Sequence, residues 1–510
     1  MTVTTRLRAS IDAAMGAVLG LVKTMTRREG LTLNARIEIA WTGGVREAVW
    51  GLALSAAPRE GAVIALCRVS TGASRRSLIV QDSLPPQDGD LSYHRGYVVT
   101  ITSRYWNRVI DDLSGRSGET GIAVLHTHPG RGNPVWSADD DNADRELAAF
   151  LFGEGFLKGS APLVSIVVSE DQLRARELRW TRDAGVTMHV VTRYRTLSRS
   201  HFEFRRTAEA GPEAYQPPSW ADRSVRVFGR DGQRLLAEVH VAFVGTGGVG
   251  SITAEDSARM GFGRMSLWDP DVIKTVNINR SGSFTFSDAQ RRAGKAETLA
   301  AMIGRVALVR EVWVWWRKAD VRHSDELARL LDADVISLAV DDVRVRNFVN
   351  AVAYAHFIPV LDGANVIRST AEDDVTADAA TVEAGGARVS VLVPGGPCLW
   401  CSGHITSRKL SLAYRTEAEV AADRARGYVE HLGPEHAPSV MPMNAMTAAL
   451  VELRLQDLLY GLSKRPVSEV YYDLVGGTLD ELPRDRVAGC PHCELAEGLG
   501  DAAELPHSDH

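Results

Sequence analysis

Short apolar runs broken by turn-forming residues dominate the first part of the chain. The runs LNARIEIAW, EAVWGLALSA and GAVIALCRVS lie between residues 33 and 72 and are separated by glycine, proline or arginine, which predicts a meander of β-strands. Residues 97–113 predict a strand that continues into a helix, and GIAVLHTHP, APLVSIVVS and ARELRWTR predict three further strands. We therefore expect a mixed α/β unit over residues 35–205, followed by a polar, proline-bearing linker over residues 206–221.

From residue 222 onward, apolar runs of strand length alternate with segments of helical spacing. The alternation continues to about residue 365 and predicts a doubly wound parallel sheet within a second domain over residues 222–495. The segment MNAMTAALVELRLQDLLYGL, residues 443–462, has helical apolar spacing and is expected to pack on that sheet. The last residues, 496–510, are acidic and are predicted to be disordered.

The N-terminal segment, residues 1–34, contains an apolar stretch over residues 11–22. Asp12 within this stretch and the absence of a small-residue cleavage pattern argue against a signal peptide, so an amphipathic helix is expected. No run reaches the roughly 18 apolar residues that a membrane span needs. We therefore expect a cytoplasmic protein without a membrane partner.

The length and charge of the chain narrow the function classes. At 510 residues the chain is too long for one ordinary core, so two or more domains are expected. The composition is 45% hydrophobic and 24% charged, with a net charge of −6, which is typical of a globular protein. Nucleic-acid binding through a basic face therefore has no support.

A glycine-rich turn follows the apolar run Val241–Val244. The turn, Gly245-Thr246-Gly247-Gly248-Val249-Gly250, precedes a helix-like segment, and this order lets backbone N–H groups and a helix N-terminus approach a phosphate. The next strand ends at Asp269, which can accept hydrogen bonds from a ribose. Arg280 and Lys295 follow, and two cations suit an enzyme that handles a triphosphate better than one that transfers a hydride. A nicotinamide dehydrogenase remains the alternative.

In the order of these motifs, residues 222–495 resemble the ThiF/MoeB family, which includes the ubiquitin-activating enzymes. Asp222–Gly229 with Gly232-Gln233 resembles the family's first motif, and Ser337–Asp342 with Arg346-Asn347 resembles the strand end that carries the magnesium-binding aspartate. The resemblance implies a Rossmann-like domain that uses ATP and Mg²⁺ to adenylate the C-terminal glycine of a ubiquitin-like protein.

The resemblance also implies a homodimer in which Arg223 reaches the active site of the partner protomer. Of the remaining catalytic residues, Arg280 and Lys295 would contact the triphosphate, and Asp341 would hold the magnesium. The implied nucleotide-binding residues are Gly245, Gly247, Gly248, Gly250, Asp269, Asp271, Asn277, Arg280, Lys295 and Asp341.

Four of the five cysteines form two pairs, Cys398 with Cys401 and Cys490 with Cys493. In a reducing compartment such pairs are more often zinc ligands than disulfides, because four thiolates complete a closed tetrahedral site. The ThiF/MoeB resemblance includes this structural zinc site, which would tie the end of the sheet to the C-terminal segment. Cys67 lies in an apolar run and is expected to be buried.

Two histidines, His126 and His128, end the predicted strand GIAVLHTHP. Side chains two apart on a strand project to the same side, and a carboxylate about a dozen residues on can complete a three-ligand zinc site with one open position. The open position holds a water whose pKa falls toward about 7, which gives a hydroxide nucleophile. Asp140 and its neighbour Asp139 compete for the third ligand, and the spacing from Ser137 favours Asp140.

With Pro129 and the spacing of Ser137 and Asp140, about residues 35–200 resemble the JAB/MPN (JAMM) metalloproteases, which include deubiquitinases. The resemblance implies that His126, His128 and Asp140 hold a catalytic zinc and that Ser137 stabilises the oxyanion. The interval from histidine to serine is one residue longer than in the family pattern, which predicts a reshaped loop over the metal.

The JAMM resemblance also requires a glutamate as general acid and base on an early strand. Glu47 is the expected residue, although it lies one position too far from Gly51, and Glu60 is the next candidate. The carboxylate must lie within hydrogen-bond reach of the metal-bound water. Without it, the domain would be a non-catalytic docking module.

The two resemblances together predict a bifunctional bacterial protein. The peptidase would trim a ubiquitin-like precursor or cleave a conjugate, and the second domain would adenylate the exposed glycine, in a conjugation pathway such as antiphage defence with a ubiquitin-conjugating-type partner. The fusion favours a shared substrate, because tethering raises effective concentration. Activation of a sulfur-carrier protein for cofactor or metabolite synthesis is the alternative. Because all cysteines after Cys67 are assigned to zinc, no thioester is expected, and Ser439 is either an ester-forming hydroxyl or an ordinary loop serine.

Overall fold

The computed structural model describes residues 35–507 except 95–97, 117–118, 131, 159, 200, 209–214, 308–311, 372–375, 377, 417, 421–437 and 464. The chain divides into two compact units, Met1–Ala35 and Arg36–His510. The helix predicted over residues 11–22 lies outside the described residues. No helix in the described part of the chain is both long enough and apolar enough to cross a bilayer.

The first half of the larger unit is built on a nine-stranded mixed sheet in the order β11-β10-β1-β3-β2-β6-β7-β8-β9. Its strands are β1 (Arg36–Thr42), β2 (Ala62–Thr71), β3 (Arg75–Leu84), β6 (Gly121–Thr127), β7 (Leu163–Val168), β8 (Leu173–Thr181), β9 (Gly185–Val191), β10 (Arg193–Leu197) and β11 (Phe202–Arg206). Helices α4 (Ser103–Ser114) and α5 (Ala138–Gly153) pack on one face through Tyr105, Val109 and Leu151. A separate hairpin joins β4 (Leu91–His94) to β5 (Val98–Ile101).

The strand predicted over EAVWGLALSA is wrong, because this segment is helical. Thr42 caps the turn by accepting a hydrogen bond from the Val45 amide at 3.2 Å, and α2 (Gly43–Arg46), η1 (Glu47–Gly51) and α3 (Leu52–Leu54) follow in succession. Val49 and Ala53, four residues apart, are both buried against the other face of the sheet. Four-residue spacing places side chains on one side of a helix. Glu47 is therefore on an exposed helical turn and not on a strand.

The second half contains an eight-stranded sheet in the order β14-β13-β12-β15-β16-β17-β18-β19. Strands β12 to β16 are parallel and the remaining pairings are antiparallel. Its strands are β12 (His240–Val244), β13 (Arg264–Trp268), β14 (Trp313–Arg317), β15 (Val335–Leu338), β16 (Val360–Ser369), β17 (Val382–Leu392), β18 (Glu469–Asp473) and β19 (Thr478–Glu481).

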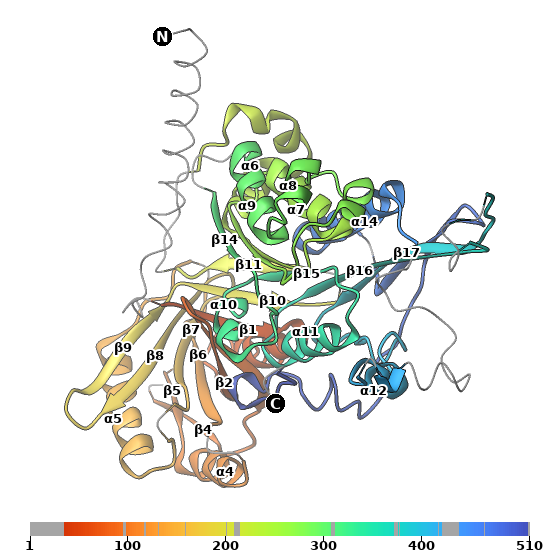
Figure 1. Cartoon of the computed structure of the whole chain (residues 1–510). Helices are drawn as coiled ribbons and strands as arrows, with labels where there is room; N and C mark the ends of the chain where they lie inside the picture. The colour runs from red at the N-terminus through yellow and green to blue at the C-terminus, as the bar shows by residue number, and fades with distance from the viewer. Residues whose placement is uncertain are drawn as a thin grey trace. The chain divides into compact units, whose positions relative to one another are not determined.

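Helices cover both faces of this second sheet, as the doubly wound pattern predicts. One side carries α7 (Gly248–Met260), α9 (Lys295–Val306) and α14 (Met441–Tyr460), and the other carries α10 (Ser324–Leu330) and α11 (Val343–Ala355) (Figure 1). The shorter elements are α6 (Asp222–Glu238), η3 (Thr275–Arg280), α8 (Phe286–Gln290) and α12 (Ser407–Ala413). The mixed α/β architecture with a Rossmann-like domain is confirmed, and the helix expected over residues 443–462 is α14.

The segment that follows the second domain is ordered as far as residue 507, in contrast to the disorder predicted for residues 496–510. The Asp501 carboxylate accepts hydrogen bonds from the Thr71 amide and hydroxyl at 2.9 and 2.6 Å. The Gly498 amide donates to the Tyr354 carbonyl at 2.9 Å. Acidic composition predicted disorder, but these groups have partners on both halves of the chain.

A buried charge cluster joins the two sheets. Asp334, just before β15, accepts hydrogen bonds from Arg193 at 2.5 Å, Arg75 at 3.0 Å and the His240 amide at 3.0 Å. Glu38 pairs with Arg193 at 2.7 Å, and both carboxylates are fully buried. Burial opposes ionisation, but the surrounding guanidinium groups hold the pKa of Asp334 well below its usual range. Nothing in the sequence pattern predicts this cluster, because its members come from strands of two domains.

Candidate functional site

The glycine turn lies at the carboxyl end of β12, where it packs tightly against the end of β15. Gly245 has a φ of +87°, and a Cβ there would lie 2.3 Å from the Ala339 carbonyl oxygen. A Cβ at Gly250 would lie 2.0 Å from the Gly245 carbonyl oxygen. In contrast, a Cβ at Gly247, which caps α7, would meet nothing within 4 Å. The helix N-terminus is therefore open at the position where a phosphate would approach it.

Asp269 at the end of β13 holds the glycine turn in place. Its carboxylate accepts hydrogen bonds from the Thr246 amide at 2.8 Å and from the Asp271 amide at 3.0 Å. Burial raises the pKa of Asp269, against the opposing effect of Lys295. The Lys295 ammonium lies 4.0 Å from Asp269 and 2.6 Å from the more exposed Asp271. The structure thus brings these two acids and the lysine together beside the turn.

Asn277 and Arg280 lie in η3, next to the same turn. Asn277 is buried, and its side-chain oxygen accepts a hydrogen bond from the Lys274 amide at 2.8 Å. The Arg280 guanidinium makes no hydrogen bond or ion pair with any described residue and remains half-buried. A cation left without a protein partner in this position can contact a phosphate.

Asn444 on α14 is a residue of this site that sequence reasoning missed. Its side-chain nitrogen donates to the Arg280 carbonyl at 2.9 Å, and its oxygen accepts from Asn365 at 2.8 Å. A Cβ at Gly248 would lie 2.2 Å from the same nitrogen. Ser439 lies at hydrogen-bond distance, 3.4 Å from the Asn444 oxygen. No local motif marks Asn444, because its partners lie far away in the sequence.

Asp341 follows β15 and is exposed, whereas its neighbour Asp342 is used within the protein. Asp342 caps α11 by accepting from the Arg344 amide at 2.8 Å. The partly buried Arg346 donates two hydrogen bonds to the Val340 carbonyl, at 3.0 and 2.8 Å, which fixes the backbone beside Asp341. Of the two acids, Asp341 is the one whose carboxylate is free to bind a cation.

Arg223 lies in the exposed first turn of α6. It forms no ion pair with any described residue, and no described contact brings it to the glycine turn of its own chain. Its predicted reach into a partner protomer stays a prediction.

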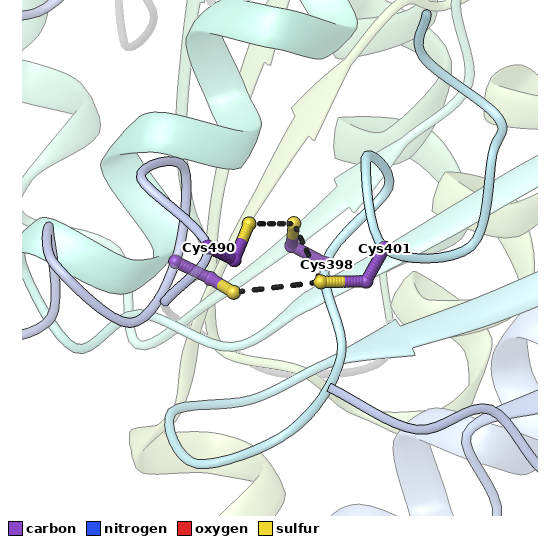
Figure 2. Close-up of side chains that lie close together, drawn as sticks. Cys398, Cys401 and Cys490 are labelled. Carbon is purple, nitrogen blue, oxygen red and sulfur yellow. Dashed lines mark hydrogen bonds between the residues drawn. The ribbon is translucent and has the colours of Figure 1, made fainter. Parts of the chain in front are cut away.

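The four paired cysteines converge, as predicted (Figure 2). The Cys398 sulfur lies 3.6 Å from that of Cys401 and 3.9 Å from that of Cys490, and the Cys401 and Cys493 sulfurs are 3.7 Å apart. None of the four forms a disulfide. Four sulfur ligands at this spacing fit a tetrahedral zinc ion. Asn350 on α11 supports both loops, accepting from the Leu399 amide at 3.0 Å and donating to the His492 carbonyl at 3.3 Å.

His126, His128 and Asp140 also converge, at the carboxyl end of β6 and the start of α5. Their ligand atoms lie within 4.8 Å of one another. The Asp140 carboxylate lies 3.3 Å from the His126 Nε2 and 3.8 Å from the His128 Nε2. The His126 Nε2 is buried and has no hydrogen-bond partner among the described residues. A buried ring nitrogen directed at a second imidazole and a carboxylate fits a metal ligand.

Ser137 and Asp140 form a capping box at the start of α5. The Ser137 amide and hydroxyl both donate to Asp140 at 2.7 Å. Although burial opposes it, the nearby His126 imidazole and the hydrogen bonds that Ser137 donates hold the pKa of Asp140 well below its usual range. Asp139 is exposed and outside the cluster, so the geometry favours Asp140 as the third ligand.

The loop between His128 and Ser137, predicted to be reshaped by its extra residue, is tied to the turn after β7. The Ser169 hydroxyl donates to the Gly132 carbonyl at 2.6 Å, and the Asp171 carboxylate accepts from the Gly132 amide at 3.1 Å. These contacts accommodate the extra residue without separating the three ligands.

Glu60, and not the expected Glu47, borders the three-ligand cluster. The residue after it, Gly61, exchanges hydrogen bonds with Thr127, which lies between the two histidines, at 2.8 and 3.0 Å. Burial, together with His126, lowers the pKa of His128, while Asp140 and Glu60 act in the opposite direction. Glu60 also accepts a hydrogen bond from the Val99 amide of β5 at 3.1 Å. Glu47, in contrast, is exposed on η1 and has no described interaction with the cluster.

The comparison with protein families concerns the second half of the chain. A family model described as the ThiF family matches residues 221–488. The sulfur carrier protein ThiS adenylyltransferase of Bacillus subtilis (strain 168) is 31% identical over 140 residues, which are 27% of this chain and 41% of that protein. The molybdopterin-synthase adenylyltransferase of Escherichia coli (strain K12) is 28% identical over 142 residues, 28% of this chain and 55% of that protein. The NEDD8-activating enzyme E1 catalytic subunit of Arabidopsis thaliana is 28% identical over 189 residues, 37% of this chain and 39% of that protein. The chain thus spans about half or less of the length of these relatives.

Proposed function

This chain belongs to the ThiF family, whose model matches more than half of it, and on that basis we propose that residues 222–495 adenylate the C-terminal glycine of a ubiquitin-like or sulfur-carrier protein with ATP. One observation carries the proposal. The backbone of Arg280 and the end of β15 before Asp341 both border the open glycine turn, beside the carboxyl ends of neighbouring parallel strands, and no described residue pairs with the Arg280 guanidinium. Ligands of open α/β sheets bind in that location.

In the proposed reaction a carboxylate oxygen of the terminal glycine attacks the α-phosphorus of ATP. The bond to the bridging oxygen breaks, pyrophosphate leaves, and an acyl adenylate forms. Arg280 and Lys295 neutralise the triphosphate, and the N-terminus of α7 faces the phosphates. Asp341 would hold a magnesium ion, which supplies charge neutralisation to the leaving group when bound. Asp269, Asp271 and Asn277 shape the nucleotide pocket, and Arg223 completes the site of a partner protomer in a homodimer.

The class of acceptor protein divides the proposal into two pathways. The names of the relatives include a sulfur carrier protein and the ubiquitin-like protein NEDD8. We favour ubiquitin-like conjugation in the bacterial cytoplasm, including antiphage defence with a ubiquitin-conjugating-type partner, because a peptidase in the same chain can reverse or prepare conjugation. Sulfur-carrier activation is the alternative. A conjugating-enzyme homologue among neighbouring genes would favour the first, and a sulfurtransferase the second.

The first half supports a second activity, a JAMM-type zinc peptidase. The supporting observation is the convergence of His126, His128 and Asp140 on one point, with an unpartnered buried ring nitrogen. These residues would hold a zinc ion, which supplies an activated water when bound. Ser137 would stabilise the oxyanion, and Glu60 would take the proton from the water and give it to the leaving amine. Glu60 replaces Glu47 in this role, because Glu60 precedes Gly61, which is hydrogen-bonded to Thr127 between the two histidines, whereas Glu47 has no described interaction with the cluster.

ATP–pyrophosphate exchange tests the adenylation site. The probe is the ubiquitin-like protein encoded beside this chain, with a C-terminal glycine. Asp341→Ala is expected to abolish exchange while the protein stays folded, whereas the control Asp231→Ala, an exposed acid on α6, is expected to exchange normally. Unchanged exchange in Asp341→Ala would refute the assignment.

A matched pair of glutamate variants tests the peptidase. Glu60→Gln and Glu47→Gln are both expected to keep one zinc at the histidine site, because neither residue is a ligand. Only Glu60→Gln is expected to lose cleavage of the same ubiquitin-like protein extended beyond its glycine. If Glu47→Gln is the inactive variant, the assignment of the base is wrong, and if neither variant is inactive, the domain uses another base. A wild-type protein that binds no zinc and cleaves nothing would favour a docking module.

A further inference from the structure

Arg176 on β8 is a buried arginine on the face of the first sheet that carries His126. Ser165 on β7 pairs with Arg176 on one side and with Val124 of β6 on the other. Directly paired residues project to the same face of a sheet, and so do residues two apart on one strand, as Val124 and His126 are. Arg176 and His126 therefore point to the same face, which α5 covers. Arg176 is only 7% exposed there.

The guanidinium of Arg176 ties this face of the sheet to the helix that supplies the third ligand. Its Nε donates to the Asp144 carboxylate at 2.8 Å, and its Nη1 donates to the Asp141 carboxylate at 2.5 Å. Both acids lie on α5, one and four residues after Asp140. Asp144 is itself buried, and hydrogen bonds between charged groups are stronger than those between neutral groups. Arg176 therefore anchors the first turn of α5, which carries Asp140, to the sheet.

The flat face of the same guanidinium packs on Trp136, the residue before Ser137. The Arg176 Cζ lies 4.0 Å from the centroid of the indole ring, which is a cation–π distance. A second neighbour of the indole is His126, with the two ring centroids 6.0 Å apart. The indole Nε1 is buried and has no hydrogen-bond partner among the described residues. Packing against Arg176 and His126, and not a hydrogen bond, therefore holds the indole in place.

We propose that Arg176 is a positioning residue for a zinc ion at the histidine site, which comprises His126, His128 and Asp140. Through the indole of Trp136 it fixes one side of the His126 ring, and through the two acids of α5 it fixes the Asp140 carboxylate. This inference rests on the zinc site proposed for the first half of the chain. Groups that orient metal ligands without touching the metal typically contribute about tenfold to hundredfold to metal affinity.

The contacts of Arg176 require a guanidinium. This group presents donors along its edges to two carboxylates and, at the same time, a flat face to an aromatic ring. A lysine ammonium is a point charge on a flexible stem and cannot do both. Arg176→Lys therefore keeps the positive charge beside Asp144 but loses the geometry.

The zinc affinity of Arg176→Lys, measured in the full-length chain by competition with a chelator, tests the proposal. The His126→Ala protein supplies the baseline for zinc at the four cysteines, so the difference isolates the histidine site. Affinity at the histidine site is expected to fall about tenfold to hundredfold. The matched control is Arg179→Lys on the same strand, whose side chain is 41% exposed and pairs with Glu177, and it is expected to keep the wild-type affinity. An affinity of Arg176→Lys within about twofold of the wild type would overturn the proposal.

Two variants of Trp136 keep the test decisive if Arg176→Lys fails to fold, because they leave both ion pairs of Arg176 intact. Trp136→Phe keeps an aromatic face and removes only an N–H that has no partner among the described residues, so it is expected to retain the zinc affinity. Trp136→Leu loses the aromatic face and is expected to bind zinc about tenfold more weakly. Equal affinities of these two variants would overturn the proposal.

Urea denaturation of the metal-free proteins separates positioning from general stability. If Arg176 only stabilised the fold, zinc affinity would follow the free energy of unfolding across all four variants, and that result would overturn the proposal. Zinc binding is measured without any substrate, so a wild-type chain that binds zinc at the histidine site and cleaves nothing would refute the peptidase alone. A wild-type chain without zinc at this site would overturn the metal site and this inference together.

Discussion

Asp334→Asn is expected to destabilise the larger unit strongly, because it removes one of two carboxylates from a cluster of buried arginines. Asp334 is fully buried and lies 2.5 Å from Arg193, 3.0 Å from Arg75 and 3.6 Å from Arg36. Asparagine keeps the hydrogen bond that Asp334 accepts from the His240 amide, but not the charge. Removal of one partner from a buried ion pair costs about 3–5 kcal/mol, because the remaining charge stays buried.

The assay is urea denaturation at pH 7, followed by the fluorescence of buried tryptophans in both halves, Trp41 and Trp268. The matched control is Glu238→Gln, which removes a partly exposed carboxylate 3.1 Å from Arg234 and is expected to change the free energy of unfolding by less than about 1 kcal/mol. The effect of Asp334→Asn is expected to shrink in acid. Its depressed pKa gives stability above the ordinary carboxyl range, and this stability is lost as the pH falls. A loss below about 1 kcal/mol at pH 7 would refute the reasoning that the cluster holds the halves together.

Three further predictions follow from single sites. Burial raises the pKa of Glu452 on α14 to about 7, so the wild type is expected to lose up to about 3 kcal/mol of stability as the pH rises from about 4.5 to 7. In urea titrations Glu452→Gln is expected to abolish this loss, and the same pH dependence in the variant would contradict the prediction. Metal analysis is expected to show the loss of one zinc per chain in His126→Ala and in Cys401→Ser, and only the cysteine variant is expected to lose thermal stability. Loss of both zinc ions in either variant would show that the two sites are not independent. Ser439→Ala is expected to retain all activity, because Ser439 is a loop residue whose hydroxyl is hydrogen-bonded to Asn444. Loss of a base-labile covalent adduct in this variant would instead assign an ester intermediate to Ser439.

Motifs whose members lie close together in the sequence were predictable. The side chains of both candidate metal sites come together, because the members of a Cys-x-x-Cys pair, or of His-x-His on a strand, lie side by side whatever the rest of the fold does. The glycine turn was predictable for the same reason, since strand, turn and helix are consecutive. The helix that contains Glu47 was not predictable, because the run EAVWGLALSA is apolar enough to fit the spacing of a strand or of a helix. Only the cap at Thr42 and the burial of residues four apart show that the segment is helical.

The sequence by itself determined the family of the second half and the side chains that gather in each cluster, because these depend on residue type and short spacing. The tertiary structure alone decided which glutamate stands near His128, since Glu60 reaches that site through the pairing of β2 with β6. It also placed Asn444 beside Arg280 and assembled Asp334 with arginines of another domain. These contacts join residues far apart along the chain, and no local pattern encodes a pairing that forms only when two sheets pack together.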